Sequence, residues 1–235
     1  MQVGITPLNT NNTAILIFAN SAQQEAFAKP FESSALLFDA LNRDILKKVE
    51  RTGLPYYHVS EKEQIGNSFA QRFTNAIQSI YTKGYDRVIT VGNDTPHLNS
   101  GQILKAAQQL ETNDIVLGPS LDGGFYLMGL KKSHFNAKTF LKLPWQTAGL
   151  SQSMYRLIAA NKTKLFTLET LVDIDSISDV NRILQSKRHI STLLRQLLLA
   201  VFSEKNTSFF RYQLSFQNSF LSLYYNKGSP LPLFS

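Results

Sequence analysis

The stretch "DIVLGPSLDGGFYLMGL", Asp114–Leu130, contains two runs of strand-forming residues separated by a carboxylate and two glycines. The apolar runs on either side have the length of buried strands. Asp and Gly are poor strand residues, so sheet stability alone does not account for Asp122, Gly123 and Gly124. We expect the interruption to lie at the mouth of a sheet, where a carboxylate and an open backbone can meet a ligand.

Similar strands and several helices are predicted around this stretch. Strand-length runs occur at "TAILIFAN" (13–20), "PYYHVS" (55–60), "DRVITVGND" (86–94) and "KLFTLE" (164–169). Helical periodicity separates them at residues 33–53, 60–84, 102–110, 148–162 and 176–187. Strands that alternate with helices imply right-handed crossovers and a mostly parallel sheet. The prediction is therefore an α/β fold with a three-layer, mostly parallel, doubly wound sheet.

Three of these helices carry specific expectations. The first ends at Gly53 and is expected to bury one side, formed by Leu36, Leu37, Leu41, Ile45 and Val49. In the second, Ser60 and Glu63 have capping-box spacing, so the helix is expected to open there. Its apolar side would consist of Ile65, Phe69, Phe73, Ile77 and Ile80. Ser176 and Asp179 have the same capping-box spacing at the start of the last one.

Composition limits the class of protein. The 235 residues can bury a full core and fit one domain with an appendage, and 43% are hydrophobic and 17% charged. Cysteine is absent, which excludes disulfides, thiolate metal sites and a Cys nucleophile. The start "MQVGITPLNT" has neither a basic n-region nor an apolar h-region, and no apolar run reaches the roughly 18 residues that span a bilayer. We expect a cytoplasmic protein.

Positive charge is concentrated at the C-terminal end. Residues 186–235 carry +5 of the formal net charge of +7, so residues 1–185 carry only +2. The main body shows no basic face of the kind that reads nucleic acid, and we expect no nucleic-acid partner. We divide the chain into an α/β domain, 1–185, and a basic, aromatic-rich extension, 186–235. The extension is predicted to begin with an amphipathic helix over 189–204. It would then pack as an arm or a dimer interface, or contact an anionic membrane surface.

Four acids are expected at one edge of the sheet. In open α/β sheets, ligands bind beyond the carboxyl ends of the strands. Asp94 and Asp122 follow two such strands, and Asp173 and Asp175 follow "KLFTLE". Carboxylates gathered without basic partners favour a cation, and Mg²⁺ or Mn²⁺ held by one or two carboxylates and by substrate phosphates is the usual arrangement.

Each of these residues also has a simpler interpretation. "NDTP" and "DGG" are turn signals, and His97 suits the same turn. Asp175 suits an N-cap for the last helix, and Asp173 a surface hydrogen bond. Trp145 suits a core or lid position as well as a platform for a sugar ring. The combination of these motifs in this order favours the functional interpretation.

The order of motifs resembles a bacterial family of GT-A-like glycosyltransferases of largely unknown function. The motifs are "GNDTPHL", "ETNDIVLGPSLDGGFYLMGL", "PWQT" and "LVDIDSISDV", and the match runs from about Gln64 to about Leu184. That family is related to nucleotide-diphospho-sugar transferases and to nucleotidyltransferases of cofactor assembly. The resemblance implies a doubly wound fold, a nucleotide-sugar donor, an unidentified acceptor and a divalent metal.

The resemblance also implies roles for individual residues. Asp94 resembles the family's metal-binding acid, and Asp122 with Gly123 and Gly124 its substrate-site turn, where Asp122 is a second metal ligand. The remaining substrate-binding candidates are Asn93, Thr95, Asp173, Asp175, Lys29 and Trp145. The sequence identifies no catalytic base.

One departure from the family pattern concerns phosphate binding. The family's loop after the first strand carries a Lys and an Arg close together, whereas here it reads "NSAQQEAFAKPFESS" with Lys29 as its only cation. Either Lys29, Arg43 or Arg72 takes over the phosphates, or the metal does so, or the chain no longer transfers anything. The predicted function is a metal-dependent glycosyltransferase. The alternatives are a nucleotidyltransferase that releases pyrophosphate and a non-catalytic binding protein.

Overall fold

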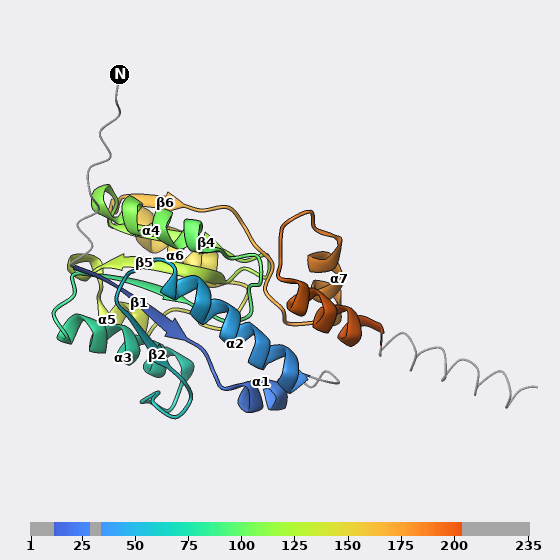
Figure 1. The fold of residues 1–235 in the computed structure, drawn as a ribbon. Helices are drawn as coiled ribbons and strands as arrows, with labels where there is room; N and C mark the ends of the chain where they lie inside the picture. Colours follow the sequence, from blue (N-terminus) through green and yellow to red (C-terminus); the bar gives the residue numbers. More distant parts are fainter. Residues whose placement is uncertain (1–11, 29–33, 204–235) are drawn as a thin grey trace, which may run out of the picture.

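A six-stranded sheet lies between two layers of helices in the computed structural model, which describes residues 12–28 and 34–203 (Figure 1). The strands are β1 (Thr13–Phe18), β2 (Tyr56–Val59), β3 (Arg87–Val91), β4 (Ile115–Pro119), β5 (Phe125–Lys131) and β6 (Leu165–Thr167). The helices are α1 (Ala22–Ala28), α2 (Ser34–Glu50), α3 (Phe69–Thr82), α4 (Ser100–Thr112), η2 (Lys132–His134), α5 (Ala137–Phe140), α6 (Leu150–Ala160) and α7 (Ile177–Gln185). Residues 192–203 are also helical.

The strand order is β2-β1-β3-β5-β4-β6, and β5 runs antiparallel to both of its neighbours. The other pairings are parallel, so the predicted α/β fold with a mostly parallel sheet is confirmed. The sequence predicts no helix between β4 and β5, and the structure has none there. Only Ser120–Gly124 separates the two strands, and so short a connection permits an antiparallel hairpin but no parallel return.

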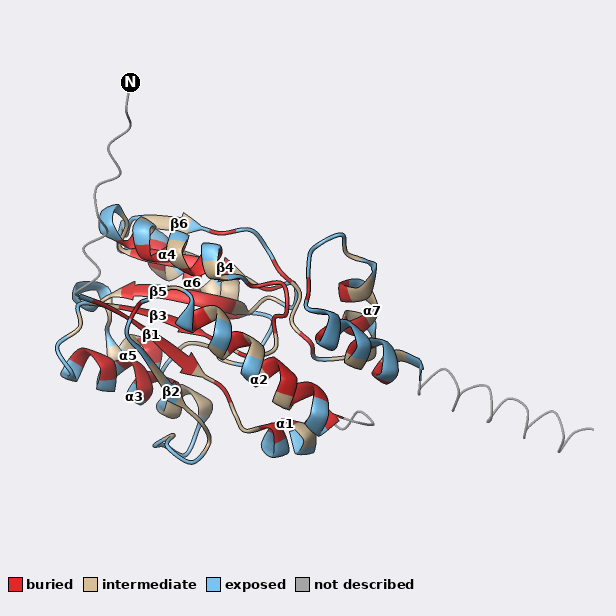
Figure 2. Ribbon diagram, viewed as in Figure 1, coloured by how far each residue is buried: buried red, intermediate tan, exposed pale blue. Residues whose placement is uncertain are grey.

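Side chains of the sheet alternate between two cores. On β1, Ile15 and Ile17 contact the cluster that contains residues of α2 and α4. Ala14 and Leu16 contact the opposite cluster, which contains residues of α3, α5 and α6. Figure 2 shows the central strands β1, β3, β4 and β5 buried between these helical layers. A central sheet buried on both faces explains why its strands read as continuous apolar runs.

A third cluster joins the described part of the C-terminal extension to the body. Leu194, Leu198 and Val201, from the helix at 192–203, pack with residues of α2 and α7. Arg195 and Gln196 of the same helix are exposed, as an amphipathic helix requires, although Leu193 and Leu199 are exposed as well. The aromatic-rich segment from Thr207 onward lies outside the described residues.

The helix predicted to start at Ser60 starts nine residues later. Ser68 is the N-cap of α3, and its hydroxyl accepts from Gln71 N. Glu63 does accept a hydrogen bond from Ser60 N at 2.9 Å, but this closes a single turn. Gly66 follows with φ +138°, which a continuing helix does not tolerate, and Ile65 is therefore 74% exposed instead of buried.

The face predicted for α2 is correct except at its first residue. Leu37, Leu41, Ile45 and Val49 are buried, but Leu36 is 64% exposed. Leu36 lies about 140° around the helix from Leu41, on the side that faces away from the core.

Candidate functional site

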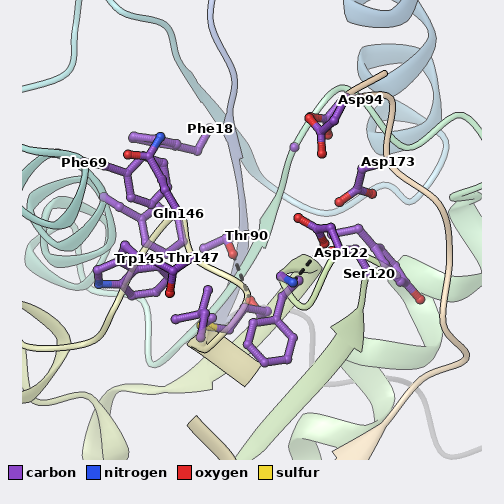
Figure 3. Close-up of a pocket in the computed structure, with 18 of the residues that line it drawn as sticks. Phe18, Phe69, Thr90, Asp94, Ser120, Asp122, Trp145, Gln146, Thr147 and Asp173 are labelled. Carbon is purple, nitrogen blue, oxygen red and sulfur yellow. Dashed lines mark hydrogen bonds between the residues drawn. The ribbon is translucent and has the colours of Figure 1, made fainter. Parts of the chain in front are cut away.

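A cavity of about 430 Å³ opens at the end of the sheet where β1 and β3 finish and the β4–β5 turn begins. Its wall has two sides of different chemistry (Figure 3). Acidic side chains from the loops lie on one side. Aromatic side chains of β1, α3 and the loop before α6 lie on the other, and Thr90 of β3 lies between them.

The structure places all four predicted acids in the wall of this cavity. Asp94, Asp122, Asp173 and Asp175 line it, although they come from three separate segments. Figure 3 shows the carboxyl groups of Asp94, Asp122 and Asp173 pointing toward a shared space. The side chain of Asp122 belongs to an exposed turn, while Asp94 and Asp173 are half-buried.

Backbone hydrogen bonds between the loops explain this convergence. Ile174 N donates to Asp94 O at 2.9 Å, which ties the segment after β6 to the turn after β3. Leu171 N donates to Pro119 O at 3.1 Å, and Leu121 N donates to Leu171 O at 3.0 Å. The three acidic loops are therefore joined as extensions of the sheet, which holds their carboxylates at one edge.

Asp173 lies at the centre of the acidic side. Burial raises its pKa to about 7, and the charges of Asp94 and Asp122 act in the same direction. The Thr95 hydroxyl donates to Asp173 Oδ1 at 2.5 Å and opposes this effect. The Ser120 hydroxyl is near enough to lower the pKa as well, but it is buried and has no partner at full hydrogen-bond geometry. The negative charges of Asp94, Asp122 and Asp173 therefore repel one another, and the Ser120 hydroxyl beside them has no hydrogen-bond partner among the described residues.

The donor set fits a hard cation that shares its ligands with a substrate. Within the described residues, no group of three or more His, Cys, Asp or Glu side chains is arranged to hold a metal on its own. Carboxylate and hydroxyl oxygens are the ligands that Mg²⁺ and Mn²⁺ prefer, and such ions usually take one or two carboxylates and complete their shell with phosphates and water. Asp94 and Asp122 could serve in this way.

The two glycines of the β4–β5 turn have different neighbours. Gly124 lines the cavity, and its N–H donates to Asp122 Oδ1 at 2.9 Å. Gly123 has φ +95°, and a Cβ there would lie 2.8 Å from the carbonyl oxygen of Ala148. Both the amide and the hydroxyl of Ser151 donate to Gly123 O. Gly123 thus lets the turn approach the start of α6, whereas Gly124 faces the cavity.

Trp145 belongs to the aromatic side and is also packed into the core. Its Nε1 donates to Phe140 O at 2.7 Å, and its ring centroid lies 5.7 Å from that of Phe69 and 5.1 Å from that of Phe73. Its predicted core position is therefore confirmed, and because it also lines the cavity, its role as a platform for a sugar ring stays a prediction.

Other predicted site residues do not line the cavity. Asn93 is buried and donates to Asn42 Oδ1 at 2.8 Å, and Thr95 is occupied with Asp173. Lys29 lies outside the described residues. The alternative interpretation of Asp175 as an N-cap is wrong, because Ser176 is the N-cap of α7 and forms a capping box with Asp179.

Sequence reasoning missed several residues of the wall, namely Phe18, Thr90, Ser120, Gln146 and Thr147. Ser120 could have been found, because it follows the strand directly and lies in the same connection as Asp122. Gln146 has a φ of +59°, a backbone conformation that its residue type does not predict.

The loop after β1, in which Lys29 is the only cation, is hydrogen-bonded to the carboxylate of Glu61. Ser21 N and Ser21 Oγ each donate to Glu61 at 2.7 Å, and these are groups that a phosphate would otherwise use. Of the proposed substitutes, Arg43 pairs with Asp39 at 2.6 Å and Arg72 Nε donates to Gln64. Neither lines the cavity, and no Lys or Arg does so among the described residues.

Comparison with protein-family models identifies the relationship. Residues 22–147, more than half of the chain, match the family described as "Uncharacterized protein conserved in bacteria" (DUF2064). The chain belongs to this family. The matched range includes Asp94 and the β4–β5 turn and ends just after Trp145, so it spans most of the cavity wall. A search of curated proteins gave no match.

Solved structures confirm the GT-A-like fold of this DUF2064 member. A "putative nucleotide-diphospho-sugar transferase" from Desulfovibrio desulfuricans G20 aligns with a TM-score of 0.71 and 22% identity over 82% of this chain and 97% of that one. Weaker matches include Rv0371C in complex with manganese from Mycobacterium tuberculosis H37Rv (TM-score 0.46, 10% identity, 74% and 99% covered). Another is a cytidylyltransferase from Leptospira borgpetersenii serovar Hardjo-bovis (0.40, 15%, 84% and 95%). The fold assignment depends on the first match alone.

Proposed function

We propose that this DUF2064 protein is a metal-dependent transferase that uses a nucleotide-diphospho-sugar donor. The observation that carries the proposal is the cavity itself, in which Asp94, Asp122 and Asp173 face an aromatic wall at the carboxyl edge of the sheet. The likeness of the fold to a protein described as a nucleotide-diphospho-sugar transferase supports the same substrate class.

In this proposal Asp94 and Asp122 hold Mg²⁺ or Mn²⁺. A cation held by these two carboxylates would supply positive charge to a diphosphate leaving group. Because no Lys or Arg lines the described wall, the carboxylates would repel a bare diphosphate, and the charge that binds it has to arrive with the metal. Asp173, which accepts a hydrogen bond from Thr95, lies at the centre of the acidic side of the cavity. Asp175 is exposed at the edge of that side.

The opposite side of the cavity suits the uncharged part of the donor. Trp145 and Phe69 offer ring faces to a nucleoside base or a sugar ring, which bind by stacking and apolar contact. Gln146 and Thr147 lie beside them and supply polar groups for hydroxyls (Figure 3). Gly124 leaves room for the ligand near Asp122 because it has no side chain.

A non-catalytic role is the second candidate, and one observation favours it. Glu61 occupies the amide and hydroxyl of Ser21 in the loop where the family's phosphate-binding cations are expected. The same depletion counts more strongly against a nucleotidyltransferase, because a triphosphate carries more charge than a diphosphate and needs more positive charge around it.

A thermal-shift screen tests the proposal. Full-length protein is mixed with nucleoside diphosphates, triphosphates and nucleotide sugars, with and without Mn²⁺. A donor at about 100 times its dissociation constant should stabilise the fold by about 2.7 kcal/mol, which is a shift of several degrees. We expect Asp94→Asn to abolish the Mn²⁺-dependent shift.

The matched control is Asp86→Asn, which changes an exposed acid at the opposite end of β3. It should keep the shift. Metal-dependent binding that survives Asp94→Asn contradicts the site, and the absence of any shift across the panel supports the non-catalytic candidate. Pyrophosphate release from a triphosphate would instead identify a nucleotidyltransferase.

The remaining proposals concern the partners of the C-terminal extension, residues 186–235. Within residues 12–28 and 34–203, no helix combines the length and apolarity that crossing a bilayer requires. We propose a cytoplasmic protein that meets its acceptor, or a second copy of itself, through residues 186–235. Vesicle co-sedimentation and sedimentation velocity of the full chain, compared with a chain truncated at Ser186, distinguish membrane contact from dimerisation.

A further inference from the structure

A second cavity, of about 650 Å³, lies behind the turn that carries Asp94. It is bounded by α2, by the turn leading into α4 and by residues 188–194. Its chemistry is the reverse of that of the first cavity. Five cationic side chains line it, namely Arg43, Lys47, Lys48, Arg51 and Arg188, against the single carboxylate of Asp44.

Three of these cations form one stripe, with Arg43 and Lys47 on α2 and Arg51 in the turn directly after its last residue, Glu50. They are spaced four residues apart, and Arg51 N donates to Lys47 O at 3.2 Å, so the three line the same cavity one above another. Like charges at this spacing destabilise a helix slightly. Arg43 pairs with Asp39, whereas Lys47 and Arg51 form no ion pair within the described residues. Both are exposed and available to a ligand.

The rest of the wall is held in place by buried contacts. Lys48 pairs with Asp44, and its Nζ donates to Pro96 O at 2.8 Å. The Ser100 hydroxyl donates to Lys48 O at 2.8 Å. These bonds fix α2 to the start of α4, whose positive dipole end lies at the same cavity. The cavity is therefore built by ordered elements of the fold.

His97 adds an unsatisfied polar group to this wall. Its side chain is 6% exposed, and its Nε2 has no hydrogen-bond partner within the described part of the chain. Burial lowers the pKa of His97 to about 4, with smaller contributions from the positive charges of Arg188 and Lys48. The positive field of the cavity therefore reaches the imidazole.

The segments outside the described residues carry more positive than negative charge. Residues 1–11, 29–33 and 204–235 contain two acidic side chains, Glu32 and Glu204, against four cations, Lys29, Lys205, Arg211 and Lys227. The charge that complements the cavity is therefore expected from a separate molecule. Its volume falls within the range of small-molecule sites.

We propose that this basic cavity is a binding site for a phosphate-bearing molecule, with Lys47 and Arg51 as the main contacts to the phosphate. Ammonium and guanidinium groups bind phosphate oxygens by charge-assisted hydrogen bonds. The site is separate from the acidic cavity and needs no metal, so it does not depend on the proposed transferase activity. The phosphate belongs either to a soluble phosphorylated molecule or to a lipid headgroup.

Calorimetric titration of the full chain with inorganic pyrophosphate, without divalent metal, tests the site. A parallel arm measures co-sedimentation with phosphatidylcholine vesicles that contain phosphatidic acid. We expect binding in at least one arm, and we expect the double variant Lys47→Gln, Arg51→Gln to weaken it by about tenfold or more. Loss in the pyrophosphate arm identifies a soluble ligand, and loss in the vesicle arm alone identifies a headgroup.

The matched control is Lys138→Gln, Lys142→Gln, which removes two exposed cations at the same spacing from a surface outside both cavities. It should bind like the unmodified chain. Asp94→Asn should also keep metal-free binding, which separates this site from the proposed donor site. Absence of binding in both arms overturns the proposal. Equal weakening in the control pair, or binding that the Lys47 and Arg51 changes weaken in neither arm, does so as well.

Discussion

At the scale of single residues, the stretch after β4 combines a functional requirement with a structural one. Asp122 and Gly124 face the acidic cavity, but Gly123 serves the fold by allowing the turn to contact Ala148 and Ser151. The sequence predicts a turn and a carboxylate at this place. It does not predict which glycine is required for which purpose, because that depends on α6, a helix more than twenty residues away.

Gly123→Ala should therefore cost stability without a direct effect on the cavity. A side chain at φ +95°, with its Cβ 2.8 Å from a backbone carbonyl, is strained, and we expect a loss of about 1–3 kcal/mol in the free energy of unfolding. In Gly124→Ala the added carbon meets only side-chain oxygens, the nearest at 3.2 Å, so the loss should stay below about 1 kcal/mol. Urea denaturation measures both, and equal losses would contradict the assignment.

At the scale of elements, the sequence predicts the strands better than the ends of the helices. The central strands β1, β3, β4 and β5 fall within apolar runs because burial on both faces leaves a continuous signal, whereas the edge strands β2 and β6 are only partly buried. The sequence places the start of α3 too early because Ser60 and Glu63 have the spacing of a helix cap. The positive φ of Gly66, which ends that turn, cannot be read from the sequence. The direction of β5 follows from the length of its connection to β4 rather than from its own residues.

The candidate site was predictable to a similar extent. Asp94 and Asp122 were expected at one edge because parallel strands end together, and the structure places them in one cavity. The aromatic side of the cavity is harder to predict from the sequence. Phe18 and Phe69 have the same apolar character as core residues, and their position at the cavity depends on how the helices pack around the sheet.

The helix at 192–203 offers a direct test of its contribution to the fold. Leu198 is fully buried against α2 and α7, so Leu198→Ala should lower the free energy of unfolding by about 2–5 kcal/mol. Its neighbour Leu199 is 43% exposed, and Leu199→Ala should cost less than about 1 kcal/mol. Thermal unfolding of the full chain compares the two. If Leu198→Ala leaves the main transition unchanged, this helix does not stabilise the α/β body.

At the scale of the whole molecule, two cavities of opposite charge lie on either side of one turn. The segment 93–98 presents Asp94 to the acidic cavity and His97 to the basic one. The net charge of +7 describes neither environment, because it averages a cavity lined by carboxylates with one lined mainly by cations. The turn itself is fixed by backbone bonds to Ile174 and by the contact of Lys48 with Pro96.

The burial of His97 in this turn predicts how the stability of the molecule depends on pH. Its pKa of about 4 in the folded chain lies below the ordinary value of 6.5, so the unfolded chain takes up a proton first as the pH falls. His97 therefore favours the fold fully above pH 6.5, and this contribution is lost between pH 6.5 and pH 4. By the size of the shift, the loss is on the order of 3 kcal/mol.

His97→Gln isolates this contribution from that of the carboxylates, which titrate in the same range in both proteins. Asp173 acts in the opposite direction, because its raised pKa makes stability fall as the pH rises toward 7. That effect is common to both proteins and cancels in the difference between them. We expect the unmodified chain to lose stability relative to His97→Gln as urea denaturation is repeated from pH 7.5 down to pH 4.5. Parallel stability curves would show that His97 takes up its proton in the folded chain without cost, and that its position between Lys48 and Arg188 does not oppose the charge.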